Sequence, residues 1–304
     1  MAVTLGTPAA RSPATPAGTG RPVDRRRRDR HHRGVGRWAV LAVVTAGALL
    51  MLVPFALMLL NAFKSPGQYS SEGPLSWPDE FYTQGLRTYW TAVDFPQKVW
   101  NSALISGSVA VLAVAVSLLN AYALGVGRVR GRLWIVGLFL LANMLPQESL
   151  VYPLYHLAKE VGLYNTRLVV IIIFTVIQSA FGTYLLASVL GTFPRSLLEA
   201  GALDGAGKWT ILWRIILPNV RPTCAVLLVF FFIWTWNEFL IPLVMLIDNE
   251  TQTIPVALAS LQGDRLMDAP TTNAGTLISL VPAILFFFIF QRTLSRGITA
   301  GADK

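Results

Sequence analysis

Six apolar stretches, each long enough to cross a lipid bilayer, limit the possible folds of this chain more than any other feature. A transmembrane helix needs about 20 mostly apolar residues. Four of the six stretches contain no Asp, Glu, Lys or Arg, while the third contains Glu148 and the fifth Glu238. The sequence therefore predicts an all-α, polytopic membrane protein with six transmembrane helices. The predicted helices are Trp38–Leu60, Val99–Leu124, Leu133–Tyr155, Leu168–Leu190, Pro222–Ile247 and Asn273–Gln291.

The composition supports this class and excludes several others. Hydrophobic residues make up 54% of the 304 residues and charged residues only 13%, whereas soluble domains carry about 25% charged residues. One cysteine and three histidines, at positions 31, 32 and 156, provide neither a disulfide framework nor a metal site. Gly207-Lys208 lacks the earlier glycine and the strand context of a phosphate-binding loop. Any ATP and Mg²⁺ must therefore bind to a separate subunit.

The positions of the basic residues predict the orientation of the chain. With the N-terminus inside the cell, 19 of the 25 lysine and arginine residues fall in cytoplasmic segments, in agreement with the positive-inside rule. The opposite orientation would place those 19 charges outside. Both termini are therefore expected in the cytoplasm, and the net charge of +9 does not require a nucleic-acid partner.

The chain is expected to contain one folded region preceded by a tail. Residues 1–37 are rich in Pro, Ala, Gly and Arg and have almost nothing to bury, so a disordered basic cytoplasmic tail is predicted. Residues 38–304 form the predicted transmembrane domain. A cleaved signal peptide is the alternative for the first apolar stretch. That stretch exceeds the 7–15 apolar residues usual in such peptides, and no small-residue cleavage site follows it.

A long polar insert at residues 192–218 separates the fourth and fifth predicted helices. Ser196 to Leu203 is predicted to form a short helix that stops at Asp204-Gly205. Small residues would allow a partner protein to approach its backbone closely. The alternative is an amphipathic helix lying on the bilayer surface, which would be expected to carry a stronger basic face. Beyond the stop, an apolar ridge at helical spacing comprises Trp209, Leu212, Trp213 and Ile216.

Two sizeable segments are expected outside the cell, Lys64–Lys98 and Asp248–Thr272. The first is rich in aromatic residues such as Trp77 and Trp90. Aromatic side chains there fit either a protein partner or anchoring at the membrane interface. Both explanations remain open.

The polar insert resembles the Glu-Ala-Ala…Asp-Gly-Ala…Leu-Pro loop of binding-protein-dependent ABC permeases, in particular the carbohydrate-uptake branch that includes the smaller maltose permease subunit. The similarity extends from about Trp38 to the C-terminus. Further similar motifs are Asn101-Ser102-Ala103-Leu104, Asn120-Ala121-Tyr122-Ala123-Leu124, Trp236-Asn237-Glu238-Phe239 and the Gly297-Ile298-Thr299-Ala300-Gly301 ending. The sequence departs from the family pattern at Gly201, where a second alanine is usual, and at Leu212, where an aromatic residue is common.

The resemblance implies a pore-forming subunit without enzymatic activity of its own. Its expected partners are an ABC ATPase dimer in the cytoplasm, a second homologous permease, an extracellular sugar-binding protein and the sugar itself. The loop at 192–218 would couple the ATPase to the membrane helices, and the segment Asp248–Thr272 would reach the binding protein. The implied location is the bacterial cell membrane. The residues implied in ATPase docking are Glu199, Ala200, Gly201, Leu203, Asp204, Gly205, Ala206 and Pro218.

Polar residues inside predicted membrane helices are candidates for the transport pathway. They occur as two pairs, Gln147-Glu148 after Pro146 and Asn237-Glu238. Structural or interfacial roles are the alternative, because both pairs fit near the outer halves of their helices. An ion-coupled secondary transporter of small solutes is the main alternative function. It would need internal repeats and a midplane ion site, and the sequence has no convincing repeat. A receptor or scaffold without transport is a further alternative.

Overall fold

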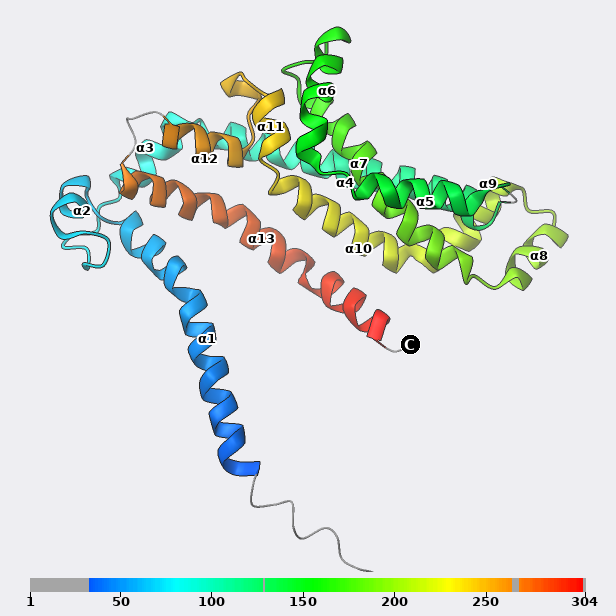
Figure 1. The fold of residues 1–304 in the computed structure, drawn as a ribbon, viewed down its shortest axis with the longest axis horizontal. Helices are drawn as coiled ribbons and strands as arrows, with labels where there is room; N and C mark the ends of the chain where they lie inside the picture. Colours follow the sequence, from blue (N-terminus) through cyan, green and yellow to red (C-terminus); the bar gives the residue numbers. More distant parts are fainter. Residues whose placement is uncertain (1–32, 128, 264–267, 303–304) are drawn as a thin grey trace, which may run out of the picture. The chain divides into compact units, whose positions relative to one another are not determined.

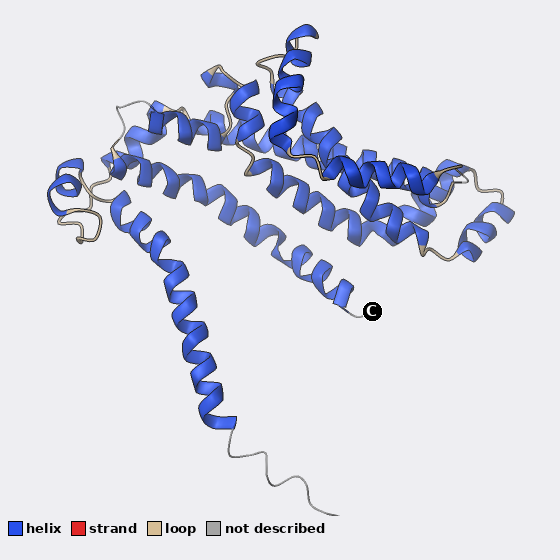
Figure 2. Ribbon diagram, viewed as in Figure 1, coloured by secondary structure: helices blue, strands red, loops and turns tan. Residues whose placement is uncertain are grey.

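The computed structural model describes residues 33–127, 129–263 and 268–302, and every regular element in these ranges is a helix (Figures 1 and 2). The first 32 residues of the predicted tail lie outside the described residues, and α1 begins at Arg33. The chain divides into two units, Met1–Val53 and Pro54–Lys304.

The helix α1, Arg33–Ala62, crosses the boundary between the two units, and Pro54 lies within it. The helices before the polar insert are α2 Pro66–Glu72, α3 Gln84–Ala92, α4 Phe95–Gly125, α5 Arg132–Asn143, α6 Gln147–Glu160 and α7 Arg167–Gly191. From the insert onward they are α8 Arg195–Leu203, α9 Lys208–Thr210, a π-helical turn Ile211–Ile216, α10 Leu217–Trp236, α11 Leu240–Met245, a 3₁₀ turn Asn249–Thr251, α12 Ile254–Gly263 and α13 Ala269–Ala302.

Five helical runs in the described part of the chain are long and apolar enough to cross a membrane. They are α1, α4, α7, the continuous run from Lys208 to Trp236, and α13; α5 and α6 make a sixth if the two are counted as one span. Four predicted helices, at 38–60, 99–124, 168–190 and 273–291, each fall within one of these runs.

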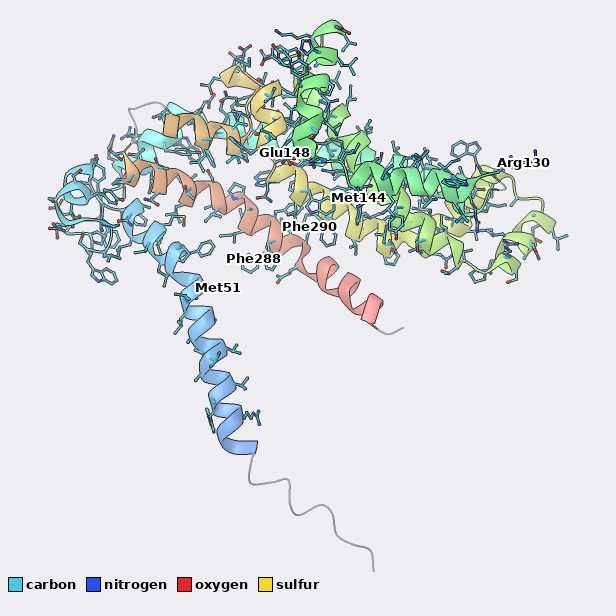
Figure 3. The ribbon with its side chains drawn as sticks, viewed as in Figure 1. Met51, Arg130, Met144, Glu148, Phe288 and Phe290 are labelled. Carbon is cyan, nitrogen blue, oxygen red and sulfur yellow. The ribbon has the colours of Figure 1, made fainter. Side chains whose placement is uncertain are left out.

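The range Leu133–Tyr155, predicted as one membrane helix, contains two helices in the structure. The helices α5 and α6 occupy this range, and they are bent by 95° at the break between Asn143 and Gln147. Figure 3 shows Met144 and Glu148 on either side of the bend. Pro146 explains the break, because proline lacks the N–H that a helix needs, its ring clashes with the carbonyl four residues earlier, and it disfavours helical geometry at the preceding residue.

The predicted fifth helix, Pro222–Ile247, also needs correction. The helical run begins earlier, at Lys208, and stops at Trp236, before α11 resumes at Leu240. Asn237 ends α10, and its side-chain amide donates to the Ile233 carbonyl at 2.8 Å. Pro242 cannot donate a hydrogen bond to Glu238 four residues earlier, so the helix does not continue through this point.

The core of the second unit lies where α4, α7 and α10 pack together (Figure 1). Ser117 of α4 is fully buried, and its hydroxyl bonds the Ala113 carbonyl at 2.6 Å and lies 3.2 Å from the Ser179 carbonyl on α7. A Cβ at Gly182 would lie 2.2 Å from the Ser117 Oγ and 3.0 Å from the Phe231 ring. The three helices therefore approach closely only because residue 182 has no side chain.

The close approach at Gly182 predicts that Gly182→Ala destabilises the protein. Overpacking a filled core costs about 1–3 kcal/mol, so thermal unfolding of the purified protein in detergent should occur at a lower temperature. Gly107→Ala in α4 is the matched control, since a Cβ at Gly107 meets nothing within 4 Å. Equal thermal stability of Gly182→Ala and Gly107→Ala would contradict this account of the core.

Candidate functional site

The polar insert folds as a short helix packed against the start of the next long helix. The inner side of α8 contacts the π-helical turn, where a Cβ at Gly201 would lie 2.6 Å from the Ile215 side chain. Leu198 packs against the same core that contains Leu212 and Ile216. Tyr122, at the end of α4, donates its hydroxyl hydrogen to the Lys208 carbonyl at 3.0 Å. The insert is therefore attached to the core and is not a free loop.

The predicted stop at Asp204-Gly205 is present as a Schellman motif. The Ala206 amide donates to the Gly201 carbonyl at 2.9 Å, and the Gly205 amide donates to the Ala202 carbonyl at 3.1 Å. Gly205 has φ of +77°, a left-handed conformation that glycine adopts without steric cost. This motif directs the chain out of α8 and into the helical run that begins at Lys208.

The outer side of α8 and the following turn expose an apolar surface. Leu203 is 88% exposed, Trp209 65% and Trp213 55%. Glu199, Ala200, Asp204 and Gly205 are also exposed, whereas Ala206 is half-buried. Exposed large apolar side chains on one polar insert are typical of a binding surface when they form a patch. The predicted apolar ridge is divided, because Leu212 and Ile216 are fully buried while the two tryptophans face outward.

Two of the predicted docking residues have a different structural setting. Gly201 is buried against Ile215, so its small size serves packing within the chain and leaves no room there for a partner. Pro218 is exposed and lies in the first turn of α10, inside the helical run rather than in a loop. It lies two residues after the π-helical turn Ile211–Ile216, a rare type of winding that occurs mostly as single turns inside α-helices.

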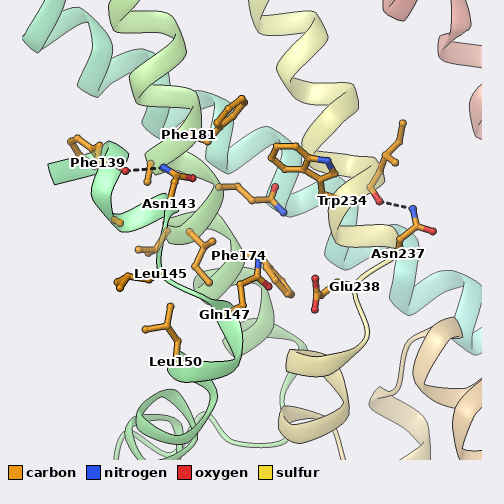
Figure 4. Close-up of a pocket in the computed structure, with 16 residues that line it drawn as sticks. Phe139, Asn143, Leu145, Gln147, Leu150, Phe174, Phe181, Trp234, Asn237 and Glu238 are labelled. Atoms are coloured by element: carbon orange, nitrogen blue, oxygen red, sulfur yellow. Dashed lines mark hydrogen bonds between the residues drawn. The ribbon is translucent and has the colours of Figure 1, made fainter. Parts of the chain in front are cut away.

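A second feature is a cavity of 540 Å³ that lies beside both helix breaks (Figure 4). Its wall is formed by the end of α5, the start of α6, the middle of α7 and the end of α10. In the view of Figure 4, the rings of Phe181 and Trp234 lie above Gln147 and Glu238. Ligand pockets of about 300–1,000 Å³ with mainly apolar walls and a few polar groups are usual for small molecules.

The structure brings three of the four predicted pathway residues to this cavity. Gln147, Asn237 and Glu238 line it, and Gln147 and Glu238 are half-buried. Glu148 is exposed and lines a separate hollow of 330 Å³ with Tyr152, Tyr155 and neighbouring residues. Consecutive side chains at the start of α6 point about 100° apart around the helix, so Gln147 and Glu148 line different hollows.

Gln178, the most buried polar residue in the cavity wall, was not among the predicted pathway residues. Its side chain is 6% exposed, and its amide nitrogen donates to the Thr235 hydroxyl at 2.8 Å. Its amide oxygen has no hydrogen-bond partner in the structure. The available signal was a glutamine in a charge-free membrane helix, since intramembrane polar residues are functional candidates in general.

A third feature is the polar anchoring of the segment that follows α11. Asn165, with φ of +61°, accepts hydrogen bonds at its side-chain oxygen from the Ile247 and Asp248 amides at 2.9 and 3.1 Å and from the Thr251 hydroxyl at 3.2 Å. Its amide nitrogen donates to the Asp248 carboxylate at 2.5 Å. One side chain between α6 and α7 therefore organises the whole turn at 247–251.

The first turns of α4 hold the same segment from another direction. Asn101 donates to the carbonyls of Glu250 and Gln252, both at 2.8 Å, and the buried Lys98 ammonium donates to the Asn249 carbonyl. The Ser102 hydroxyl accepts from the amide of Ile254, the first residue of α12, at 3.0 Å. The start of the predicted external segment 248–272 is therefore fixed, and residues 264–267 of that segment lie outside the described residues.

Comparison with known proteins places these features in a family. Curated relatives include a diacetylchitobiose uptake system permease protein of Streptomyces coelicolor, 26% identical over 265 residues, covering 86% of this chain and 87% of the relative. A lactose transport system permease protein of Rhizobium radiobacter is 29% identical and covers 84% of this chain and 93% of the relative. A trehalose transport system permease protein of Mycobacterium tuberculosis is 29% identical, and the match covers 88% of this chain and 97% of the relative.

Structural comparison gives the same fold. The chain is similar to one chain of a bacterial ABC transporter involved in the import of the acidic polysaccharide alginate, with a TM-score of 0.73 and 20% sequence identity. The match covers 86% of this chain and 97% of the other. The model of the family described as binding-protein-dependent transport system inner membrane component matches residues 121–300. The chain therefore belongs to the family of inner membrane components of binding-protein-dependent transport systems.

Proposed function

We propose that this protein is the membrane-spanning permease subunit of an ATP-driven sugar importer and forms half of the translocation pathway. The observation that carries the proposal is that the family model and the sugar-permease relatives cover most of the chain. These comparisons support an ABC importer and give no support to an ion-coupled secondary transporter. In the proposed topology, the chain crosses the bacterial cell membrane six times, counting α5 and α6 as one span, and both termini lie in the cytoplasm.

The proposed partners follow from the family and from the absence of a nucleotide-binding motif in this sequence. A separate ATPase dimer would bind ATP and Mg²⁺ in the cytoplasm, a second permease would complete the pathway, and an extracellular protein would deliver the sugar. Gln147, Asn237 and Glu238 are the proposed pathway residues, together with Glu148 from its separate hollow. Nucleic acid has no proposed role.

The transport function can be tested in proteoliposomes that contain the whole complex. ATP-dependent sugar uptake that requires both the ATPase and the binding protein is the expected result. Uptake driven by an ion gradient without ATP would instead support a secondary transporter. Failure to transport under every condition would support a receptor or scaffold.

The exposed surface of α8 is the proposed contact with the ATPase. Glu199, Ala200, Leu203 and Asp204 are exposed there, and the Schellman motif at Gly205 and Ala206 sets the angle between this helix and the next. The proposed role of Gly201 is indirect, because it seats α8 on Ile215. An exposed leucine that enters a groove on a partner contributes apolar burial that it lacks in the free subunit.

The docking proposal predicts that Leu203→Asp and Glu199→Lys abolish ATP-driven transport and reduce co-purification of the ATPase. Burying one leucine is worth about 1.5–3 kcal/mol, so Leu203→Asp should weaken ATPase binding at least about 10-fold. Both side chains are exposed, so membrane insertion should be unchanged. Leu75→Asp is the matched control, because Leu75 is 75% exposed in the predicted external segment. Normal ATPase recovery with both α8 variants would count against the docking role.

The anchored segment after α11 is the proposed contact with the extracellular binding protein. Its test exploits the pairing between the Asn165 amide and the Asp248 carboxylate. In Asn165→Asp the amide donor is replaced by a second carboxylate, which repels Asp248. Losing this hydrogen bond costs roughly 1 kcal/mol, so stimulation of ATP hydrolysis by the binding protein should fall about 5-fold. The double variant Asn165→Asp with Asp248→Asn restores a donor and an acceptor with the roles exchanged.

Recovery of stimulation in the double variant is the expected result. If the single variant is stimulated like the unmodified protein, the anchoring of this segment does not matter for the binding protein. If stimulation is lost equally in the single and double variants, the pairing of Asn165 with Asp248 is not the reason for the loss.

A further inference from the structure

We infer that the 540 Å³ cavity is a sugar-contact site of this subunit, in which the buried Gln178 oxygen accepts a hydrogen bond from a hydroxyl of a neutral sugar. The inference rests on the proposed function, since it names the substrate class that this half of the pathway contacts. It adds a residue that the sequence motifs do not indicate, on the helix α7.

The orientation of the Gln178 amide follows from its partner. Thr235 has a single hydroxyl hydrogen, which it donates to the Phe231 carbonyl at 2.9 Å. The Thr235 oxygen can therefore only accept, and it accepts from the Gln178 amide nitrogen at 2.8 Å. The amide oxygen of Gln178 is consequently directed away from Thr235.

The Gln178 oxygen is an acceptor without a donor. The side chain is 6% exposed and lines the cavity, and the oxygen has no partner in the structure. A buried polar atom that lacks a hydrogen bond is unfavourable, and native proteins rarely retain one without a reason. The oxygen itself has less than 1 Å² of accessible surface, so a hydroxyl donor bound in the cavity would satisfy it once the Gln178 side chain turns this atom toward the cavity.

Three other polar side chains of the cavity also present acceptors, while Gln147 and the Trp234 indole supply donors as well. Asn143 and Asn237 each donate their amide nitrogen to the carbonyl four residues earlier, at 2.8 Å, which turns the amide oxygen away from the helix. Glu238 adds a carboxylate, and the described residues that line the cavity include no lysine or arginine. A wall rich in acceptors suits a ligand with many hydroxyl donors and disfavours an anionic sugar.

The aromatic side chains of the cavity suit the apolar faces of a sugar ring. Trp234 is 44% exposed, and its ring lies 5.4 Å from the Phe181 ring, centroid to centroid. Figure 4 shows both rings together with Phe174 around the cavity. A pyranose ring has apolar C–H faces edged by hydroxyl groups, so an aromatic face and nearby acceptors match its two kinds of surface.

The position of the cavity agrees with a transport role. Both interruptions of membrane helices, between α5 and α6 and between α10 and α11, border it. Non-helical backbone at membrane depth is tolerated where it is enclosed by protein or lines a water-filled cavity. Polar side chains at the two breaks can therefore meet a hydrated sugar without facing lipid.

The test compares uptake by the whole reconstituted complex, using radiolabelled lactose, trehalose and diacetylchitobiose as neutral probes and digalacturonate as the acidic probe. The variant Gln178→Leu keeps the side-chain volume and removes the acceptor. The double variant Gln178→Leu with Thr235→Val removes both polar partners of a buried bond, which is better tolerated than removing one. Thr235→Val alone keeps the Gln178 oxygen.

Sugar uptake per ATP hydrolysed should fall about 10-fold in Gln178→Leu and in the double variant, as expected for one desolvated hydrogen bond. The variant Thr235→Val alone should retain more uptake than either. Trp234→Leu should lower the same ratio, and Trp234→Tyr should restore it, since the tyrosine keeps an aromatic face. This ratio separates loss of sugar contact from loss of folded complex.

Two results would overturn the inference while leaving the proposed function intact. One is a double variant that transports the neutral sugar like the unmodified complex. The other is ATP-driven uptake of digalacturonate with no uptake of the neutral probes, because an anion does not suit a wall of acceptors. If the unmodified complex shows no ATP-driven uptake of any probe delivered by its binding protein, the proposed function itself fails.

Discussion

The need to hydrogen-bond every backbone polar group without water governs this structure. Inside a bilayer that need is met by unbroken helices, and α4, α7 and α13 meet it over their apolar lengths. The helices break only at Asn143–Gln147 and Trp236–Leu240 among the described apolar runs, and both breaks border one cavity. Apart from the π-helical turn Ile211–Ile216, the departures from regular helix in these runs lie where polar side chains can compensate.

The helix α10 connects the cavity wall to the region where α8 packs. At its C-terminal end this helix carries Ile233 and Trp234 to the cavity, and at its N-terminal end it continues from the π-helical turn against which α8 packs. A movement of α8 can therefore be transmitted along a continuous helical run to the cavity wall. The Schellman motif at Gly205 and the packing of Gly201 on Ile215 form the first contacts of this path.

The folded region was predictable to a large extent because its main signals are local. Apolar runs without charges gave the long helices, and Asp204-Gly205 gave the end of α8, since glycine at a left-handed position stops a helix whatever surrounds it. The two helix breaks were not predicted, although Pro146 lies within the first and Pro242 follows the second. Membrane helices tolerate many prolines, as at Pro54 and Pro282, so a proline alone does not tell a bend from a break.

The sequence by itself determined the class of protein, the long helices and the insert that resembles an ATPase-coupling loop, because these depend on composition and on residues close together in the chain. Only the tertiary structure decided which polar residues share a site. Gln147 and Glu148 are neighbours in sequence but line different hollows, while Gln178 and Thr235 are 57 positions apart and share a hydrogen bond. The reason is physical: the direction of a side chain depends on the bend and packing of its helix, which no single stretch of sequence encodes.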